Sequence, residues 1–319
     1  MKKFVVNVTL FVLPLLLLVY PADFFISHYL KKSNNFLGYE YPVWNDIFEN
    51  KVDANIFIYG SSRAWVHLDP EVIGDSLGAK AYNFGVDGHT FRLQHLRHQI
   101  AVKSLPQPKL IIHSIDLITL MPQQDLYNYE QFLPYMLDRD DLQTPLLNFS
   151  GFEPIDFKVP LVRYYGQYDV VRESIGQFTG LDANQPVRIK GFRAEDKAWD
   201  GTFEQIRSKL KHFYVKYDPQ VKRLFEQYLE ECKQKNIKVI LVYTPEYIEG
   251  QEFEINRAEV LAMYRQMAVK FDVLFLDYSK NEISYSKEYF YNAMHMNANG
   301  VDRFNRIFME DLRKLGFKL

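Results

Sequence analysis

Short apolar runs alternate with longer segments of helical periodicity along most of the chain. Each run is rich in β-branched and aromatic residues and closes on a polar or turn residue, which is typical of buried strands. The sequence predicts five such strands, at residues 55–60, 81–85, 109–116, 238–245 and 272–279. Helical segments follow them at residues 69–77, 88–104, 218–236, 254–271 and 299–316. Two of these helices open on an Asp-Pro pair, the pattern of an N-cap and first turn.

This alternation predicts an α/β fold, a three-layer α/β/α sandwich around a mainly parallel five-stranded sheet, because strand-helix-strand repeats place helices on both faces of one sheet. Ligands bind beyond the carboxyl ends of the strands in such sheets. The regular pattern stops over residues 117–218, where no clear strand occurs. A segment of that length in a compact domain is usually functional, so we expect an inserted lid or substrate-binding region within a domain spanning residues 32–319. Its aromatic and Arg residues either line a cleft or form the insertion's own core.

The N-terminal stretch is the one candidate for a membrane segment. Lys2 and Lys3 precede an uncharged apolar run over residues 4–20. A spanning helix needs about 17–25 apolar residues, and no small-residue cleavage pattern follows the run. Residues 1–31 are therefore predicted to form a cytoplasmic tip and an uncleaved signal-anchor helix, with the rest of the chain outside the cytoplasm. This corresponds to a single-pass protein of the inner (cell) membrane, and the alternative is a buried helix of a soluble protein.

Composition excludes several classes of function. Across 319 residues the chain carries 38 Lys and Arg against 40 Asp and Glu, and a net charge of -2 provides no attraction for nucleic acid. Cys232 is the only cysteine, which excludes an intramolecular disulfide and a cysteine-based zinc site. No group of His, Asp and Glu has the spacing of metal ligands in the sequence, so neither a metal nor an organic cofactor is expected.

Two serines follow the first predicted strand, at the point where a helix is about to start. A strand-to-helix turn can present a serine hydroxyl above the sheet as a nucleophile, but serine is also a favoured N-cap. The pattern leaves both roles open for Ser61 and Ser62. His295 lies on a loop just before the last predicted helix, where it can face the same edge of the sheet and act as a base. Two further histidines also follow strand ends, His67 and His89.

Three stretches resemble conserved blocks of the SGNH (GDSL-type) hydrolase superfamily: Gly60-Ser61-Ser62, "NFG" at residues 83–85, and His295 followed by "MNANG". The likeness is closest to membrane-anchored extracytoplasmic members linked to O-acylation of cell-surface polysaccharide. It covers residues 52–116 and 236–316 and gives no help with the insertion.

The resemblance implies a role for each matched residue. Ser62 takes the position of the nucleophile and His295 that of the general base. The backbone amides of Ser62 and Gly85 take the positions of oxyanion-hole donors, with the side chain of Asn83 as a substitute third donor.

The sequence departs from the superfamily pattern at two positions. Asn292 stands where an Asp usually orients the histidine; an amide can do this too, but it stabilises the imidazolium less than a carboxylate. Asp116 falls where an Asn usually completes the oxyanion hole, and its charge would repel an oxyanion, so it either points away or caps the strand end. Turnover is therefore expected to be slow or absent.

Arg63 follows the candidate nucleophile directly. It is a candidate for binding an anionic substituent of a glycan or an acyl carrier. The alternative is an ion pair with a nearby carboxylate such as Asp69 or Asp87, because a charge at a cleft marks a site only statistically.

The predicted anchor and the resemblance together favour a membrane-anchored, extracytoplasmic serine esterase or O-acyltransferase. The resemblance implies that its substrates are acyl esters, chiefly acetyl esters, of cell-surface polysaccharide, and that a membrane-bound acyltransferase is a partner. The alternative is a catalytically weak scaffold in a polysaccharide-modifying membrane complex, and the Asn292 and Asp116 substitutions favour it. A soluble lipase is disfavoured by the predicted anchor and by the lack of a Gly-x-Ser-x-Gly motif.

Overall fold

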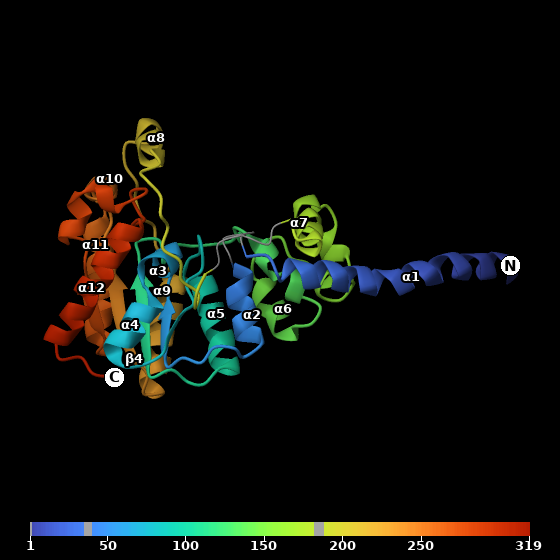
Figure 1. Ribbon diagram of the computed structural model, residues 1–319, viewed down its shortest axis with the longest axis horizontal. Coiled ribbons are helices and arrows are strands. Elements are labelled where there is room, and N and C mark those ends of the chain that lie inside the picture. Colours follow the sequence, from blue (N-terminus) through green and yellow to red (C-terminus); the bar gives the residue numbers. More distant parts are fainter. Residues whose placement is uncertain (1, 35–39, 182–187) are drawn as a thin grey trace. The chain divides into compact units, whose positions relative to one another are not determined.

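A computed structural model describes residues 2–34, 40–181 and 188–319, and the chain divides into two compact units (Figure 1). The N-terminal unit comprises residues 1–45 and 124–187, and the sheet unit comprises residues 46–123 and 188–319. The segment expected as one insertion, residues 117–218, is therefore shared. Its middle part belongs to the N-terminal unit, and residues 188–218 belong to the sheet unit.

The sheet has the five predicted strands, and all of them run parallel. They pair in the order β2-β1-β3-β4-β5. Both β1 and β3 are buried along their whole length, because helices cover both faces of a parallel sheet. The α/β prediction is thus confirmed, with strands β1 (Ile56–Tyr59), β2 (Ala81–Asn83), β3 (Leu110–Ile115), β4 (Lys238–Tyr243) and β5 (Leu274–Asp277).

The main helices begin where the sequence predicts. Asp69 and Asp218 each accept backbone N–H groups of the first turn, and a proline follows each of them. On one side α9 contacts both α5 and α11, and on the other α12 contacts α3 and α4. These contacts form the two outer layers, with α3 (Ser62–His67), α4 (Pro70–Leu77), α5 (Phe91–Ser104), α9 (Pro219–Gln234), α11 (Arg257–Phe271) and α12 (Ala298–Lys314).

The strand order reverses direction between β1 and β3, which is where doubly wound sheets bind their ligands. At this point Gly60 links β1 to α3 with a φ of +143°, a conformation that L side chains rarely adopt. A Cβ on Gly60 would lie 2.5 Å from the carbonyl oxygen of Ser114. The glycine therefore allows the chain to turn sharply and start α3 above the sheet.

Several shorter elements complete the sheet unit. In Figure 1, α8 extends away from the rest of this unit, beyond α10. We call residues 202–213 the α8 arm. Two backbone hydrogen bonds hold its C-terminal end, from Phe213 N to Phe253 O at 2.8 Å and from Ile255 N to Phe213 O at 3.1 Å. The elements are α8 (Thr202–Lys209), α10 (Ile248–Phe253), η5 (Glu282–Tyr285) and η6 (Lys287–Tyr289).

The N-terminal unit is built around the last turns of α1. Arg163 donates to both carboxylate oxygens of Asp23, at 2.7 and 2.9 Å, and both side chains are buried. Ser27 shares a 2.8 Å hydrogen bond with Tyr164. The unit contains α1 (Lys2–Leu30), the start of α2 (Glu40–Phe48), η2 (Tyr129–Tyr135), α6 (Asp140–Leu146), η3 (Pro154–Phe157), η4 (Val162–Tyr164) and α7 (Tyr168–Thr179).

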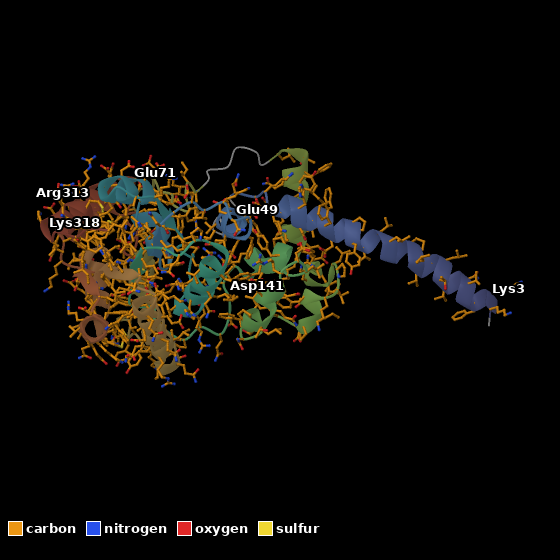
Figure 2. All side chains as sticks on the ribbon, turned by 90° about the horizontal axis from the view of Figure 1, so that it is seen from below. Lys3, Glu49, Glu71, Asp141, Arg313 and Lys318 are labelled. Carbon is orange, nitrogen blue, oxygen red and sulfur yellow. The ribbon has the colours of Figure 1, made fainter. Side chains whose placement is uncertain are left out.

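The first part of α1 has a different environment. The helix has 29 residues and is long and apolar enough to cross a membrane. Among the side chains that the structure describes, its most apolar window has no buried residue, and Phe4, Phe11 and Leu17 are 72%, 72% and 67% exposed. Figure 2 shows the side chains along this part of the helix, which begins near Lys3. Soluble proteins rarely expose so continuous an apolar surface.

Candidate active site

Ser62 and His295 meet at the carboxyl edge of the sheet, as the sequence predicts. Ser62 is the first residue of α3, and His295 lies on the loop that leads into α12. The Oγ of Ser62 lies 2.7 Å from Nε2 of His295. Both side chains are only partly buried, so a substrate can reach the hydroxyl. A hydroxyl within hydrogen-bond reach of an imidazole is the geometry of an activated nucleophile.

Asn292 determines which nitrogen of His295 carries hydrogen. Its side-chain oxygen accepts the backbone N–H groups of Met294 and His295, each at 3.0 Å, which fixes the orientation of the amide. The same oxygen lies 3.0 Å from Nδ1 of His295. Since an amide oxygen only accepts, Nδ1 must donate. Nε2 is left as the acceptor that a general base needs, facing the Ser62 hydroxyl.

The loop around His295 is held on both sides. Phe290 and Met296 form an antiparallel bridge, and the Asn297 side chain caps α12 by accepting from Gly300 N at 3.1 Å. The ring of Tyr291 stacks on the imidazole, with centroids 5.4 Å apart and an interplanar angle of 7°. These contacts restrict His295 to one position over α3.

His67 and His89 have other roles. His67 Nε2 accepts the Met296 N–H at 2.9 Å, so its Nδ1 donates to Thr244 Oγ1 at 2.8 Å. Burial, with the charge of Arg63, lowers the pKa of His67 well below its ordinary value and keeps it neutral. His89 is buried and shares a 2.8 Å hydrogen bond with Gln123. Neither histidine is bonded to Ser62.

The two neighbouring serines divide the roles that the sequence left open. Ser61 is the N-cap of α3, and its side chain accepts the N–H of Arg63. Its hydroxyl donates to Asp116 at 2.5 Å, and Thr119 donates to the other carboxylate oxygen at 2.9 Å. Asp116 therefore holds the start of α3 and takes no part in an oxyanion hole. Burial raises the pKa of Asp116, although Arg63 and the two hydroxyl donors oppose this shift.

The prediction that Arg63 binds substrate is wrong. The side chain is fully buried beneath α3, where it pairs with Glu246 and donates to the backbone oxygen of Thr244. It also donates to Thr244 Oγ1 at 2.9 Å and stacks on the Tyr243 ring, 4.6 Å from the centroid. The expected carboxylates, Asp69 and Asp87, are not its partners. A cation held this way supports the strand ends from below and is out of reach of a ligand.

Glu246 connects this arginine to a second one. Its other carboxylate oxygen accepts from Arg257 Nη1 and from the Tyr243 hydroxyl, each at 2.6 Å. Burial alone would raise the pKa of Glu246, but Arg63 and Arg257 reverse the effect and lower it. Glu246 therefore stays ionised. This network could not be predicted from local sequence, because Arg63 and Glu246 lie 183 positions apart.

The predicted oxyanion hole needs a correction at two of its three members. The Asn83 amide nitrogen donates to the carbonyl oxygens of Ala64 and Leu68, each at 2.8 Å, and its oxygen accepts the Gly85 N–H at 2.9 Å. The N–H groups of Asn83 and Gly85 are thus used in hydrogen bonds that hold the fold together. Gly85 is needed for packing, since a Cβ there would lie 2.7 Å from the backbone nitrogen of Trp65. In the described part of the chain, the Ser62 N–H donates to no other group and remains the one predicted donor free for an oxyanion.

The environment of His295 favours its neutral form. Burial against the loop and the nearby charge of Arg63 lower the pKa of His295 to about 4, although Glu246 acts in the opposite direction. The imidazole is therefore unprotonated at neutral pH. It is ready to accept the Ser62 proton.

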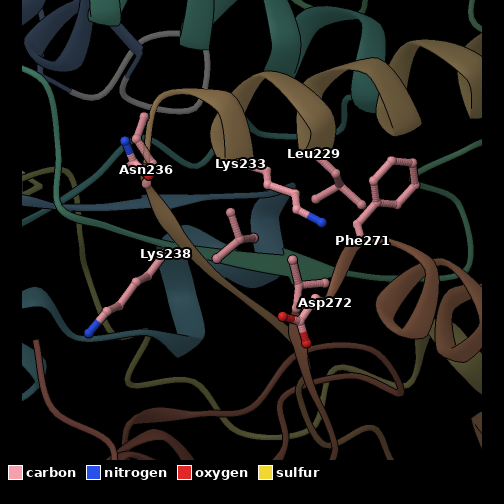
Figure 3. A pocket seen from close by; sticks show the side chains of 9 residues that line it. Leu229, Lys233, Asn236, Lys238, Phe271 and Asp272 are labelled. Atoms are coloured by element: carbon pink, nitrogen blue, oxygen red, sulfur yellow. The ribbon is translucent and has the colours of Figure 1, made fainter.

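A cavity lies beside this histidine, and part of its wall comes from residues 117–218, the segment expected to form a lid or substrate-binding region. It measures 610 Å³ and is lined mainly by apolar side chains of the α8 arm and α10, together with Asn292, Met294 and His295. Its apolar lining comprises Ile118, Phe203, Ile206, Leu210, Phe213 and Phe253. A second hollow of 390 Å³ is lined by Lys233, Lys238 and Asp272 (Figure 3). That hollow is at the start of β4, the opposite end of the strand from Ser62, and holds none of the candidate catalytic residues.

Comparisons with known proteins give distant structural likenesses. No protein-family profile and no curated protein matches the sequence. A Bacteroides fragilis protein described as an acylhydrolase shares 14% identity with a TM-score of 0.36, over 82% of this chain and 86% of its own. A GDSL-like lipase from Bacteroides thetaiotaomicron shares 13% identity with a TM-score of 0.38, over 85% of this chain and 97% of its own.

Proposed function

We propose that the protein is a serine-type ester hydrolase or O-acyltransferase with Ser62 as nucleophile, His295 as general base and Asn292 as the residue that orients it. The observation that carries this proposal is the continuous contact from Ser62 Oγ through the imidazole to Asn292 Oδ1, at 2.7 and 3.0 Å. These three residues have the arrangement of a Ser-His-Asp triad, with an amide in the third place.

The reaction proceeds in two steps, acylation of Ser62 and transfer of the acyl group to an acceptor. Ser62 Oγ attacks the acyl carbonyl while its proton moves to His295 Nε2, and the Ser62 N–H stabilises the oxyanion. The C–O bond to the alcohol breaks, the alcohol leaves with the proton from His295, and an acyl-enzyme remains. Water or a sugar hydroxyl then attacks this ester and gives its proton to His295. The serine oxygen takes the proton back as the acyl group departs.

The proposal extends to location and partners. The apolar part of α1 supports a single membrane anchor, with Lys2 and Lys3 on the cytoplasmic side and the catalytic unit outside. The sequence blocks resemble extracytoplasmic enzymes that act on surface polysaccharide, so the proposed alcohol moiety is a glycan hydroxyl. A membrane-bound acyltransferase is the proposed partner.

The alternative function, a catalytically weak scaffold, is favoured by Asn292. A scaffold does not require a free nucleophile, and its cleft can be filled. Ser62 and His295 are instead bonded at 2.7 Å and partly exposed, next to a cavity. The geometry therefore favours the enzyme.

The test is hydrolysis of p-nitrophenyl acetate and longer esters by the full-length protein in lipid nanodiscs, with a fluorophosphonate probe in parallel. We expect slow hydrolysis and labelling of Ser62, both reduced to the background rate in Ser62→Ala. Ser208→Ala, an exposed serine on α8, is the matched control and should behave like the parent. A folded parent that matches buffer with both reagents supports the scaffold. Activity that survives Ser62→Ala refutes the assignment of the nucleophile.

A further inference from the structure

The cavity beside His295 has a surface suited to hydrocarbon. Phe203, Ile206 and Leu210 line it from α8 and its C-cap, Phe253 from α10, and Ile118 from the loop after β3. Ile206 and Leu210 remain 47% and 52% exposed, so a large part of their apolar surface is accessible to a ligand. Its 610 Å³ falls in the range of small-molecule sites, about 300–1,000 Å³.

The polar groups in the cavity wall offer few free hydrogen-bonding positions for a charged ligand or a sugar. Glu246 and Glu254 reach its wall, but Arg257 donates to both of them, at 2.6 and 2.9 Å. Among the described residues no cation lines the cavity, and the ionised Glu246 in its wall disfavours an anionic ligand. Burial, with Glu246 as the second cause, raises the pKa of Glu254 to about 8, as expected of a carboxyl group in an apolar setting.

The position of the cavity connects it to the reaction. His295 and Asn292 form part of its wall, and the Nε2 of the same imidazole lies 2.7 Å from Ser62 Oγ. A group that occupies the cavity therefore lies against the histidine to which the proposed nucleophile is hydrogen-bonded. For an ester substrate, the neutral apolar group attached to the reacting carbonyl is its acyl chain.

We infer that this cavity is the acyl-chain site of the enzyme and that it takes a linear apolar chain of several carbons. The inference rests on the proposed function and names its acyl group. The acyl part of an acetyl ester ends in a single methyl group. The volume of the cavity, 610 Å³, is on the order of twenty times the volume that one water molecule occupies in the liquid. The acetyl ester expected from the sequence resemblance would leave most of it empty.

A chain-length series of neutral esters tests the inference in the full-length protein in nanodiscs. Burying one methylene contributes about 0.8 kcal/mol, which corresponds to roughly a fourfold gain in kcat/KM per carbon when the chain is fully enclosed. We expect kcat/KM to rise from p-nitrophenyl acetate to butanoate to hexanoate. In Ile206→Glu the ratio of the hexanoate value to the acetate value should fall at least tenfold. Val269→Glu, an equally apolar but 83% exposed position outside the cavity, should keep the parent ratio.

A second readout does not depend on turnover. A neutral ester of a diazirine-bearing decanoic acid is photolysed with the Ser62→Ala protein, and the crosslinks are mapped by mass spectrometry. We expect crosslinks within residues 202–213 and 293–295, and their loss in Ser62→Ala/Ile206→Glu. A flat chain-length series with Ser62-dependent acetate hydrolysis, or crosslinks confined to α1, overturns the acyl-chain site. Crosslinks in the cavity of a protein that hydrolyses no ester and is not labelled at Ser62 by the fluorophosphonate would uphold the site and reject the proposed function.

Discussion

At the scale of single residues, the proposed chemistry depends on which atom of His295 holds a hydrogen. The Asn292 oxygen accepts three N–H groups, two of them from the backbone, so it cannot turn its NH₂ group toward the imidazole without losing those bonds. An asparagine can therefore fix the tautomer here as firmly as an aspartate would. It differs from an aspartate in supplying no negative charge to stabilise the imidazolium.

The pH dependence of hydrolysis follows from the pKa of His295. A general base works only when it is unprotonated, and the pKa of this histidine is lowered to about 4. We expect kcat/KM for a neutral ester to stay level from pH 7 down to about pH 5 and to fall by half near pH 4. Stopped-flow assays, with a check of folding at each pH, measure this acid limb. A midpoint near the ordinary histidine value of about 6.5 would contradict the geometry.

Asn292→Asp should change both the rate and this acid limb. The carboxylate can accept the same three N–H groups and adds a charge that favours the imidazolium, so we expect higher esterase turnover and an acid limb at higher pH. In a serine protease the reverse change costs about 10⁴ in rate, partly through the tautomer. The gain here should be well below that value, because the tautomer is already correct. Asn292→Ala should lower activity, and equal rates for all three proteins would show that residue 292 does not orient the base.

At the scale of elements, local sequence was enough to predict the sheet and the meeting of Ser62 and His295 at its edge. Buried parallel strands are short continuous apolar runs, and Asp69 and Asp218 mark helix starts through interactions within a few residues. Ser62 and His295 could be paired because the carboxyl ends of parallel strands share one edge. The partners of Arg63 and Asn83 could not be predicted, because nothing near either residue shows which distant group its side chain will meet. The contribution of α8 to the cavity could not be predicted for a similar reason, since its apolar residues line a cavity together with residues that are distant in the sequence.

The link between α1 and η4 can be tested by removing one charge. Asp23→Leu leaves Arg163 buried without its carboxylate, which should lower the free energy of unfolding of the N-terminal unit by roughly 3–5 kcal/mol. Asp23→Leu/Arg163→Met removes both charges and should recover most of the loss. Limited proteolysis with mapping of cuts in residues 124–181 measures the change.

A solvent-exposed ion pair supplies the control for this experiment. Asp302 and Arg306 are bonded at 2.8 Å on α12, with side chains 62% and 73% exposed. Exposed pairs contribute about 0–1 kcal/mol, so Asp302→Leu should hardly change the cutting rate. If Asp23→Leu is no more sensitive to protease than Asp302→Leu, the buried pair does not hold the N-terminal unit together.

At the scale of the whole molecule, one continuous helix serves two environments. The first turns of α1 expose apolar side chains, whereas Asp23 and Ser27 are bonded within the N-terminal unit. The final segment of the helix is thus part of a folded unit, which is unusual for a segment that is removed by a protease. The composition of residues 4–20 suggested an anchor, but not that the helix would continue into a domain.

We therefore expect residues 4–20 to remain on the mature protein. Membranes washed with alkaline carbonate should retain the full chain, and N-terminal sequencing should find no start beyond residue 22. A replacement of Leu10 and Phe11 by Lys should release the protein into the wash, because charges in the middle of a span are costly. Recovery of a mature chain that begins after residue 22 would refute the anchor.

The long separation of Ser62 from His295 also determines when the protein can first act. The two residues are 233 positions apart, and β4 and β5 come after residues 124–187, which belong to the N-terminal unit. At about 5–20 residues per second, a ribosome needs roughly 10–50 seconds to proceed from the serine to the histidine. Throughout that interval the proposed nucleophile has no base, so we expect the growing chain to be unable to hydrolyse an acyl ester until His295 has been synthesised and the sheet has folded.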